Sequence, residues 1–234
     1  MKIASSDCLC RQGVGAPIRR PPRQRTPKTC TVIRGVVSLK NGVSHPCLHR
    51  IEDSFRLGRS RRDRQGSRPT FHLIERRHVE LVDEAWAKQP YHAAEGLRIE
   101  EARDVVRRGI DAARVIAVRE MKAAMQRLED AGYATVSCGV ITGNPMPADW
   151  TVDDILAVHF RMHKAEGVLF QDVLLRAARA CSLKAVSVNE KRLFEEAGRT
   201  QMELITQIGR KAGPPWGQDQ WSAALAAMIA FAAA

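Results

Sequence analysis

The spacing of hydrophobic positions along residues 71–234 predicts two long helices. Between residues 99 and 131, apolar side chains recur every three or four residues, which is the period of one helix face. A second helix is expected over residues 151–181. There, Thr151 and Asp154 have the spacing of a capping box, in which hydroxyl and carboxylate satisfy free amides at a helix start.

Shorter apolar runs rich in β-branched residues predict strands between these helices. The strands are expected at 71–82, 134–141 and 183–188, and further helices at 189–213, with a break near Gly198, and at 218–231. The resulting order is β-α-β-α-β-α-α, which is typical of the α/β class. We therefore expect a mixed sheet flanked by helices, folded from residues 70–234.

Composition separates residues 1–69 from the rest of the chain. The first 70 residues hold 16 Lys/Arg and 4 Asp/Glu, whereas the remaining 164 hold 21 and 22, so the whole basic excess of the +11 chain lies at its start. Alanine also rises from 2 in the first 70 residues to 29 in the rest. Within this basic segment only residues 31–40 have the pattern of a strand.

Three interpretations of the basic segment remain open. It is a largely disordered arm that contacts nucleic-acid phosphates, an extension without a role, or a mistranslated stretch ahead of the true reading frame. The abrupt change in composition favours the last. Under that interpretation, part of a native first strand is missing or scrambled.

Several classes of protein are disfavoured by the sequence. No apolar run reaches the 18 residues that a membrane span needs, and the first residues lack the apolar core of a secretory signal. Four of the six cysteines lie in the basic segment at spacings that match no zinc motif, and Cys138 and Cys181 are expected to pack as small apolar residues. We expect a cytoplasmic protein without a membrane partner.

One short motif occurs twice, and it supplies the main candidate chemistry. The pattern H-x-A-E-G-[LV] begins at His92 and again at His163, and its glutamates are Glu95 and Glu166. In the second copy, His159, His163 and Glu166 have the spacing of one helix face. Such a face can hold a divalent cation or serve in acid–base chemistry. Alternatively, the motif forms a buried polar network in which, for example, His92 pairs with Glu166 across elements.

A second candidate lies at the start of the last helix. Asp219 is placed in the first turn, where a carboxylate is favoured by the helix dipole and can also bind a metal ion. The neighbouring Trp216 is expected to act as a packing anchor rather than as a stacking surface.

The pieces PYHAAEGL (90–97), MHKAEG (162–167) and GPPWGQDQWSAALAA (213–227) resemble a family of bacterial proteins of unknown function. More remotely, the order of elements resembles the RNase H-like fold, especially its Holliday-junction resolvase branch. There, an acidic residue opens a final alanine-rich helix, and Asp219 is the residue that matches it.

The resemblance implies a nuclease-like protein that processes nucleic acid with Mg²⁺ or Mn²⁺ held by clustered carboxylates. Glu166 and Asp219 would then be catalytic and metal-binding, with His92, Glu95 and His163 nearby as further catalytic candidates. The helical spacing adds His159 and His163 as candidate metal ligands. The family also has an acidic residue on its first strand, and the strand expected at residues 31–40 contains none. One outcome is therefore a catalytically degenerate relative. The alternative is a non-enzymatic interaction module with a structural H-x-A-E-G network.

Overall fold

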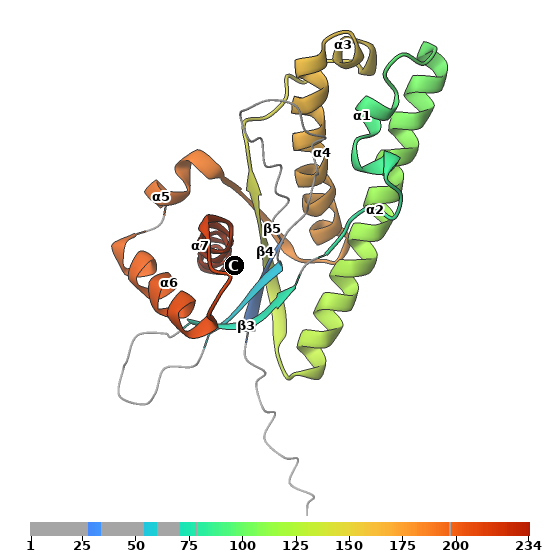
Figure 1. Ribbon diagram of the computed structural model, residues 1–234. Helices are drawn as coiled ribbons and strands as arrows, with labels where there is room; N and C mark the ends of the chain where they lie inside the picture. Colours follow the sequence, from blue (N-terminus) through green and yellow to red (C-terminus); the bar gives the residue numbers. More distant parts are fainter. Residues whose placement is uncertain (1–27, 34–53, 60–70, 78, 197) are drawn as a thin grey trace, which may run out of the picture.

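The computed structural model describes residues 28–33, 54–59, 71–77, 79–196 and 198–234, and these form a five-stranded sheet between two groups of helices (Figure 1). The strands are β1 (Lys28–Ile33), β2 (Ser54–Arg59), β3 (Phe71–Arg77), β4 (Ala134–Thr142) and β5 (Lys184–Asn189). Their order is β3-β2-β1-β4-β5. Strand β4 runs parallel to β1 and β5, whereas β2 is antiparallel to β1 and β3. The predicted α/β class with a mixed sheet is confirmed.

The helices fall into two groups, one on each side of the sheet (Figure 1). The first group is η1 (Trp86–Lys88), α1 (Pro90–Ala93), α2 (Ile99–Asp130), α3 (Val152–Leu156) and α4 (His159–Ala180). The second is η2 (Glu190–Arg192), α5 (Leu193–Glu196), α6 (Arg199–Ala212) and α7 (Gln218–Ala232). Helix α2 matches the predicted one, and it ends before Gly132, whose φ of +82° suits a helix stop.

Strand β4 separates the two hydrophobic cores, because alternate side chains of a strand point to opposite faces. Cys138 and Val140 are fully buried in the core that α2 and α4 form. Ile141 belongs instead to the core around α7, and Gly139 also faces that helix, because a Cβ added at Gly139 would lie 2.6 Å from the carbonyl oxygen of Ala226. The sheet therefore lies between α4 and α7.

The sheet includes strands from the basic segment, so it does not begin at residue 70 as expected. Strand β1 pairs with β4 from Lys28 to Val32, and β2 pairs with both β1 and β3. The physical reason is that much of β4 is buried, and the edge not paired with β5 needs a partner for its backbone groups. The strand expected at 31–40 is observed at Lys28–Ile33. The other residues to which the disordered-arm and reading-frame interpretations apply, apart from β2, lie outside the described residues.

Two boundaries differ from those expected. The helix predicted over 151–181 is divided into α3 and α4, because Val158 adopts extended backbone angles between them. The predicted capping box is confirmed: Asp154 N–H donates to the Thr151 hydroxyl, and Thr151 N–H donates to the Asp154 carboxylate at 2.9 Å. The strand predicted at 71–82 ends at Arg77.

Helix α7 is apolar around most of its circumference because it lies between the sheet and the other helices of its group. All of its alanines except Ala232 are fully buried, and the small side chains bring its backbone close to β4. Across the described ranges, no helix is long and apolar enough to cross a membrane.

Substitution Gly139→Ala should destabilise the protein by about 1–3 kcal/mol, because the added methyl group would overlap the α7 backbone and force the helix away from β4. The matched control is Gly143→Ala, where the nearest atom to an added Cβ lies 3.9 Å away on the Gln171 side chain. Urea unfolding of both variants measures the difference. Equal stability of the two variants would contradict this view of the α7–β4 contact.

Candidate metal centre

The two copies of the repeated motif meet in space, although they have different local structures. In the first copy, His92 lies in α1, and Gly96 turns the chain toward α2 with a φ of +77°. In the second copy, the whole motif lies inside α4. The repeat is therefore a repeat of side chains rather than of backbone structure.

Helix α1 holds His92 against α4 because α1 also packs closely on α2. Pro90 begins α1, a position where its fixed φ and missing N–H are tolerated. It packs on Gly109 of α2, where an added Cβ would lie 2.6 Å from the Pro90 Cβ. This close contact fixes the depth at which α1 and its last-turn histidine reach α4.

Glu166 forms the central contact between α1 and α4. Its side chain is fully buried, and each of its carboxylate oxygens lies 2.9 Å from Nδ1 of His92. The backbone N–H of His92 also donates to Oε1 at 3.2 Å. The pairing of His92 with Glu166 across elements, suggested by the sequence, is confirmed.

A neighbouring phenol responds to this buried carboxylate. Burial raises the pKa of Tyr91 above its ordinary value of 10.0, and the negative charge of Glu166 raises it further. An ionised Glu166 is a buried negative charge at the junction of α1 and α4, which is a costly position without compensating positive charge.

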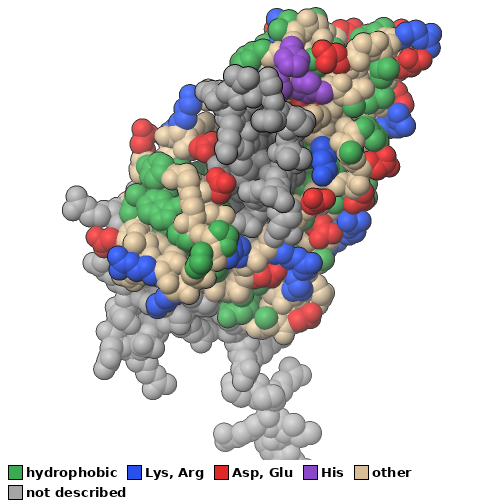
Figure 2. Space-filling view, in the orientation of Figure 1, with side chains coloured by type: hydrophobic (Ala, Val, Ile, Leu, Met, Phe, Trp, Pro, Cys, Tyr) green, Lys and Arg blue, Asp and Glu red, His purple; other side chains and the backbone are tan. Residues whose placement is uncertain are grey.

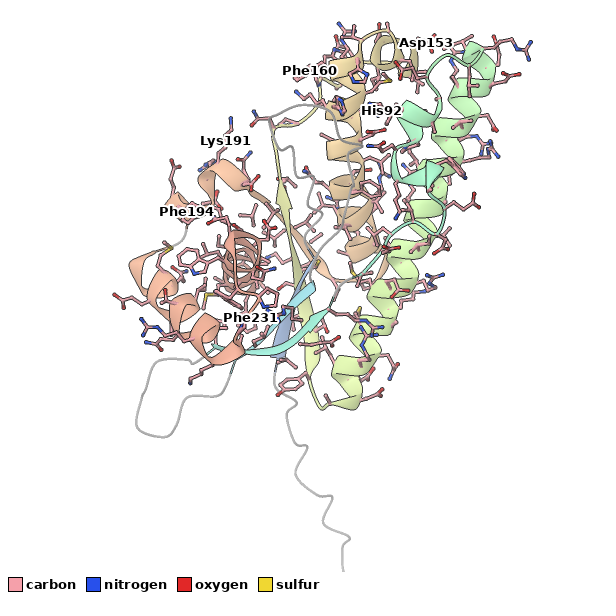
Figure 3. All side chains as sticks on the ribbon, in the orientation of Figure 1. His92, Asp153, Phe160, Lys191, Phe194 and Phe231 are labelled. Atoms are coloured by element: carbon pink, nitrogen blue, oxygen red, sulfur yellow. The ribbon has the colours of Figure 1, made fainter. Side chains whose placement is uncertain are left out.

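His92, His159 and His163 form a compact group of imidazoles at the upper end of α4, where histidine side chains reach the surface (Figures 2 and 3). One potential ligand atom from each lies within 4.8 Å of the others. The Nε2 atoms of His159 and His163 are 3.1 Å apart. For comparison, two nitrogens bound to one tetrahedral zinc ion at 2.0–2.1 Å would be roughly 3.3–3.4 Å apart.

The orientation of His92 leaves its other nitrogen directed away from Glu166. An ionised carboxylate only accepts hydrogen bonds, so with Glu166 ionised and His92 neutral, Nδ1 of His92 carries the proton and Nε2 the lone pair. This Nε2 is buried and has no hydrogen-bond partner within the described part of the protein. An unpartnered lone pair beside two further imidazoles is a suitable ligand for a metal ion.

Glu95, the glutamate of the first copy, lies on the exposed side of the group. Its Oε1 is 3.9 Å from Nδ1 of His159, which is too long for a hydrogen bond, and both side chains are more than half exposed. Glu95 is therefore a neighbour of His159 but does not hold it in place as Glu166 holds His92.

Asp219 is not brought to this group. It lies in the first turn of α7, on the opposite face of the sheet from α4, so the shared metal site expected for Glu166 and Asp219 does not fit the fold. Glu166 instead contacts His92, on the side of α4 where α1 packs. The sequence did not exclude this shared site, because it does not show which face of the sheet each helix covers.

The group contains one metal-ligand candidate that the sequence analysis had assigned only to catalysis, namely His92. The repeat itself marked His92, and the i, i+4 spacing marked His159 and His163. The repeat suggested that His92 pairs with Glu166, but the sequence did not show that a short helix, α1, packs on α4 to bring them together. Trp216 packs against Gly209 of α6, as expected for a packing anchor.

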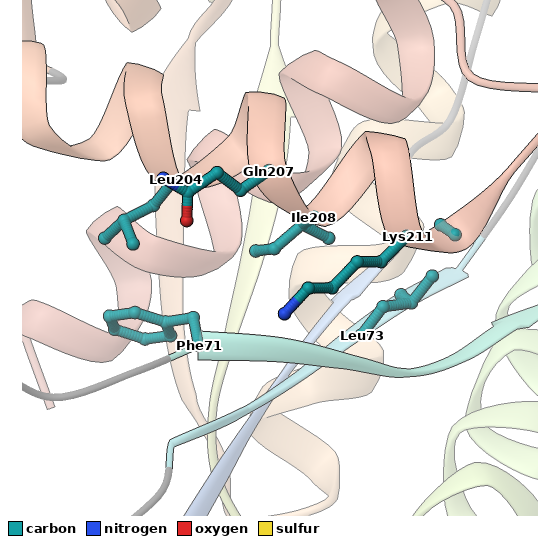
Figure 4. Close-up of a pocket in the computed structure, with 7 residues that line it drawn as sticks. Phe71, Leu73, Leu204, Gln207, Ile208 and Lys211 are labelled. Carbon is teal, nitrogen blue, oxygen red and sulfur yellow. The ribbon is translucent and has the colours of Figure 1, made fainter.

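Two cavities elsewhere have a different character. One, of about 290 Å³, lies between β3 and α6 and is lined mainly by apolar side chains, with Gln207 and Lys211 supplying polar groups (Figure 4). The other, of about 500 Å³, is bordered by Phe194, Trp216 and Trp221. The imidazole group is the stronger candidate for chemistry, because it combines convergent ligand atoms with a buried charge.

No protein-family model and no curated protein matches this chain. Among solved structures, the chain is similar to RuvC of Thermus thermophilus, with a TM-score of 0.41 and 7% identity over 85% of this chain and 92% of that one. It is also similar to T. thermophilus RuvC in complex with Holliday junction substrate, with a TM-score of 0.40 and 6% identity over 88% and 92% of the two chains. The likeness is remote, and the candidate centre rests on the geometry of this chain alone.

Tyr91 provides a test of the buried charge. In a Tyr133→Phe background, which leaves one of the two tyrosines, the phenol of Tyr91 should ionise above pH 10, as followed by phenolate absorbance. Adding Glu166→Gln should lower the pKa of Tyr91 but leave it above 10, because burial is the larger cause. A midpoint unchanged by Glu166→Gln, with the fold intact by circular dichroism, would contradict a charged carboxylate here.

Proposed function

We propose that this protein binds a divalent transition-metal ion through His92, His159 and His163, and that zinc is the ion that fits best. The observation that carries the proposal is the convergence of three imidazole ligand atoms within 4.8 Å, in a group where Nε2 of His92 is buried and has no partner in the described ranges. Imidazole nitrogens suit zinc, copper, iron and nickel, whereas magnesium takes oxygen ligands. The donor set therefore favours zinc over the Mg²⁺ or Mn²⁺ expected from the sequence.

The arrangement behind the imidazoles supports the same proposal. A histidine that binds zinc usually donates its other N–H to a carboxylate or carbonyl group, which fixes the ring and its tautomer. His92 makes this contact with Glu166. A divalent ion bound to Nε2 of His92 would also offset the negative charge of Glu166, which contacts Nδ1 of the same ring.

Three protein ligands leave one position of a tetrahedral ion for water, as in catalytic rather than structural zinc sites. His159 is 63% exposed, so solvent has access to the group. A zinc ion held by the three histidines would supply a hydroxide nucleophile for hydrolysis of an ester or phosphodiester at neutral pH. We therefore propose metal-dependent hydrolysis, with nucleic-acid phosphodiesters as the narrower substrate class implied by the sequence resemblance.

The competing function is that of an interaction module in which the repeat has only a structural role. The contact of Glu166 with both the ring and the backbone of His92 favours it, since that contact joins α1 to α4 without any metal ion. The two functions differ in one measurable property, because a purely structural network gives no reason for tight metal binding.

Zinc should bind the full chain and raise its melting temperature. At a zinc concentration one hundred times Kd, the expected stabilisation is about 2.7 kcal/mol, or roughly 5–11 °C for a chain of this size. His159→Ala and His163→Ala should each remove most of this shift, because each deletes a ligand. Thermal-shift and calorimetric titrations with Zn²⁺, Co²⁺ and Mg²⁺ measure the effect, and Mg²⁺ should give little.

The matched control is Lys164→Ala, which changes a residue of the same helix next to His163 without removing an imidazole. It should bind zinc like the unaltered chain. No zinc-dependent shift in the unaltered chain, or an equal shift in the two histidine variants, would rule out this metal centre.

Hydrolysis is tested separately with zinc-loaded protein and two chromogenic probes, bis(p-nitrophenyl) phosphate and p-nitrophenyl acetate. Turnover should fall at least about 100-fold in His159→Ala, because loss of the ion removes several kcal/mol of transition-state stabilisation. Lys164→Ala should retain the rate. Tight zinc binding with no turnover above that of His159→Ala would leave a metal-binding protein without this hydrolytic activity.

A further inference from the structure

We infer that the repeated motif forms one metal centre with crossed roles, in which the buried Glu166 of the second copy is the positioning residue for His92 of the first and sets the affinity for the ion. The inference rests on the proposed function, since it concerns the same three imidazoles. It goes further by assigning separate roles to the two glutamates of the motif.

The contacts of Glu166 restrict His92 in two ways. Both carboxylate oxygens lie 2.9 Å from Nδ1, so the ring is held in the tautomer that leaves Nε2 available. Oε1 also accepts the backbone N–H of His92 at 3.2 Å, so the carboxylate is anchored to the same residue whose ring it orients. The ring is therefore preorganised before any ion arrives.

The burial of Glu166 strengthens its effect on the ion. Its side chain has no exposed surface, and an interaction away from water is screened much less than one at the surface. A carboxylate hydrogen-bonded to a metal-binding imidazole fixes the orientation and the tautomer of that ring. The charge of Glu166 would therefore act on a bound ion across the His92 ring.

Glu95 has the same place in its copy of the motif but a different environment. Its carboxylate is 57% exposed and lies 3.9 Å from the ring of His159, which is itself 63% exposed. Exposed ion pairs contribute little because water and salt screen them and because both side chains lose freedom. The two glutamates thus provide a matched pair with the same chemistry and motif position but opposite burial.

The experiment compares Glu166→Gln with Glu95→Gln in the full chain, with zinc affinity measured by competition against a chromophoric chelator. Glu166→Gln keeps an oxygen acceptor for His92 but loses the charge, and it should weaken zinc binding about 10–100-fold. Glu95→Gln should change the affinity less than about fivefold. Equal affinities of Glu166→Gln and the unaltered chain would overturn the inference, as would equal losses in the two variants.

Two further measurements separate positioning from a general structural effect. In a His92→Ala background, Glu166→Gln should cost no additional affinity, because the carboxylate acts through the ring that has been removed. The visible absorption of bound Co²⁺ should be the same in Glu166→Gln as in the unaltered chain, since all three nitrogen ligands remain. It should change in His92→Ala. An additional loss in the double variant, or an altered Co²⁺ spectrum in Glu166→Gln, would contradict a positioning role.

The folded state is checked by thermal melting of each metal-free variant. If Glu166→Gln does not fold, Glu166→Asp replaces it, because it keeps the charge but withdraws the carboxylate from His92 by one methylene. The same loss of affinity is expected there, and an unchanged affinity would overturn the inference. Absence of zinc binding by the unaltered chain would instead refute the proposed function, so the two failures are distinguishable.

Discussion

The contact between the buried carboxylate of Glu166 and His92 is the interaction on which the candidate centre depends. It joins the short helix α1 to α4 and occupies Nδ1 of His92, a residue whose ring lies beside those of His159 and His163. A buried carboxylate without a partner costs several kcal/mol, so the approach of α1 to α4 and the pairing of these two side chains stabilise each other. Gly109 of α2 also contributes, because its lack of a side chain lets Pro90 of α1 pack closely against α2.

Strand β4 imposes the second constraint, because it divides the molecule into two cores. The alternation of its side chains assigns α2 and α4 to one face and α7 to the other. A chemical group on α7 therefore cannot share an ion with a group that α4 directs toward α1. This separation is the reason that Glu166 and Asp219 do not form the shared carboxylate site that the sequence resemblance implies.

Elements that depend on interactions between residues close in the sequence were predicted better than those that depend on distant segments. Helix α2 and the cap of α3 were predicted closely, because periodicity and capping are local properties of the chain. Two features were not predicted. The division between α3 and α4 depends on the extended backbone of one residue, Val158. The place of β1 depends on its pairing with the edge of β4 that β5 does not cover. The place of β1 is decided by pairing between distant segments of the chain.

The sequence by itself determined which side chains carry the candidate chemistry: the repeat marked His92, Glu95, His163 and Glu166, and helical spacing added His159. Only the tertiary structure decided their roles, since it made Glu166 the partner of His92, left Glu95 exposed and placed Asp219 beyond the sheet. The physical reason is that spacing along one helix fixes which residues share a face. The burial and the partner of a side chain depend instead on which other element packs against that face.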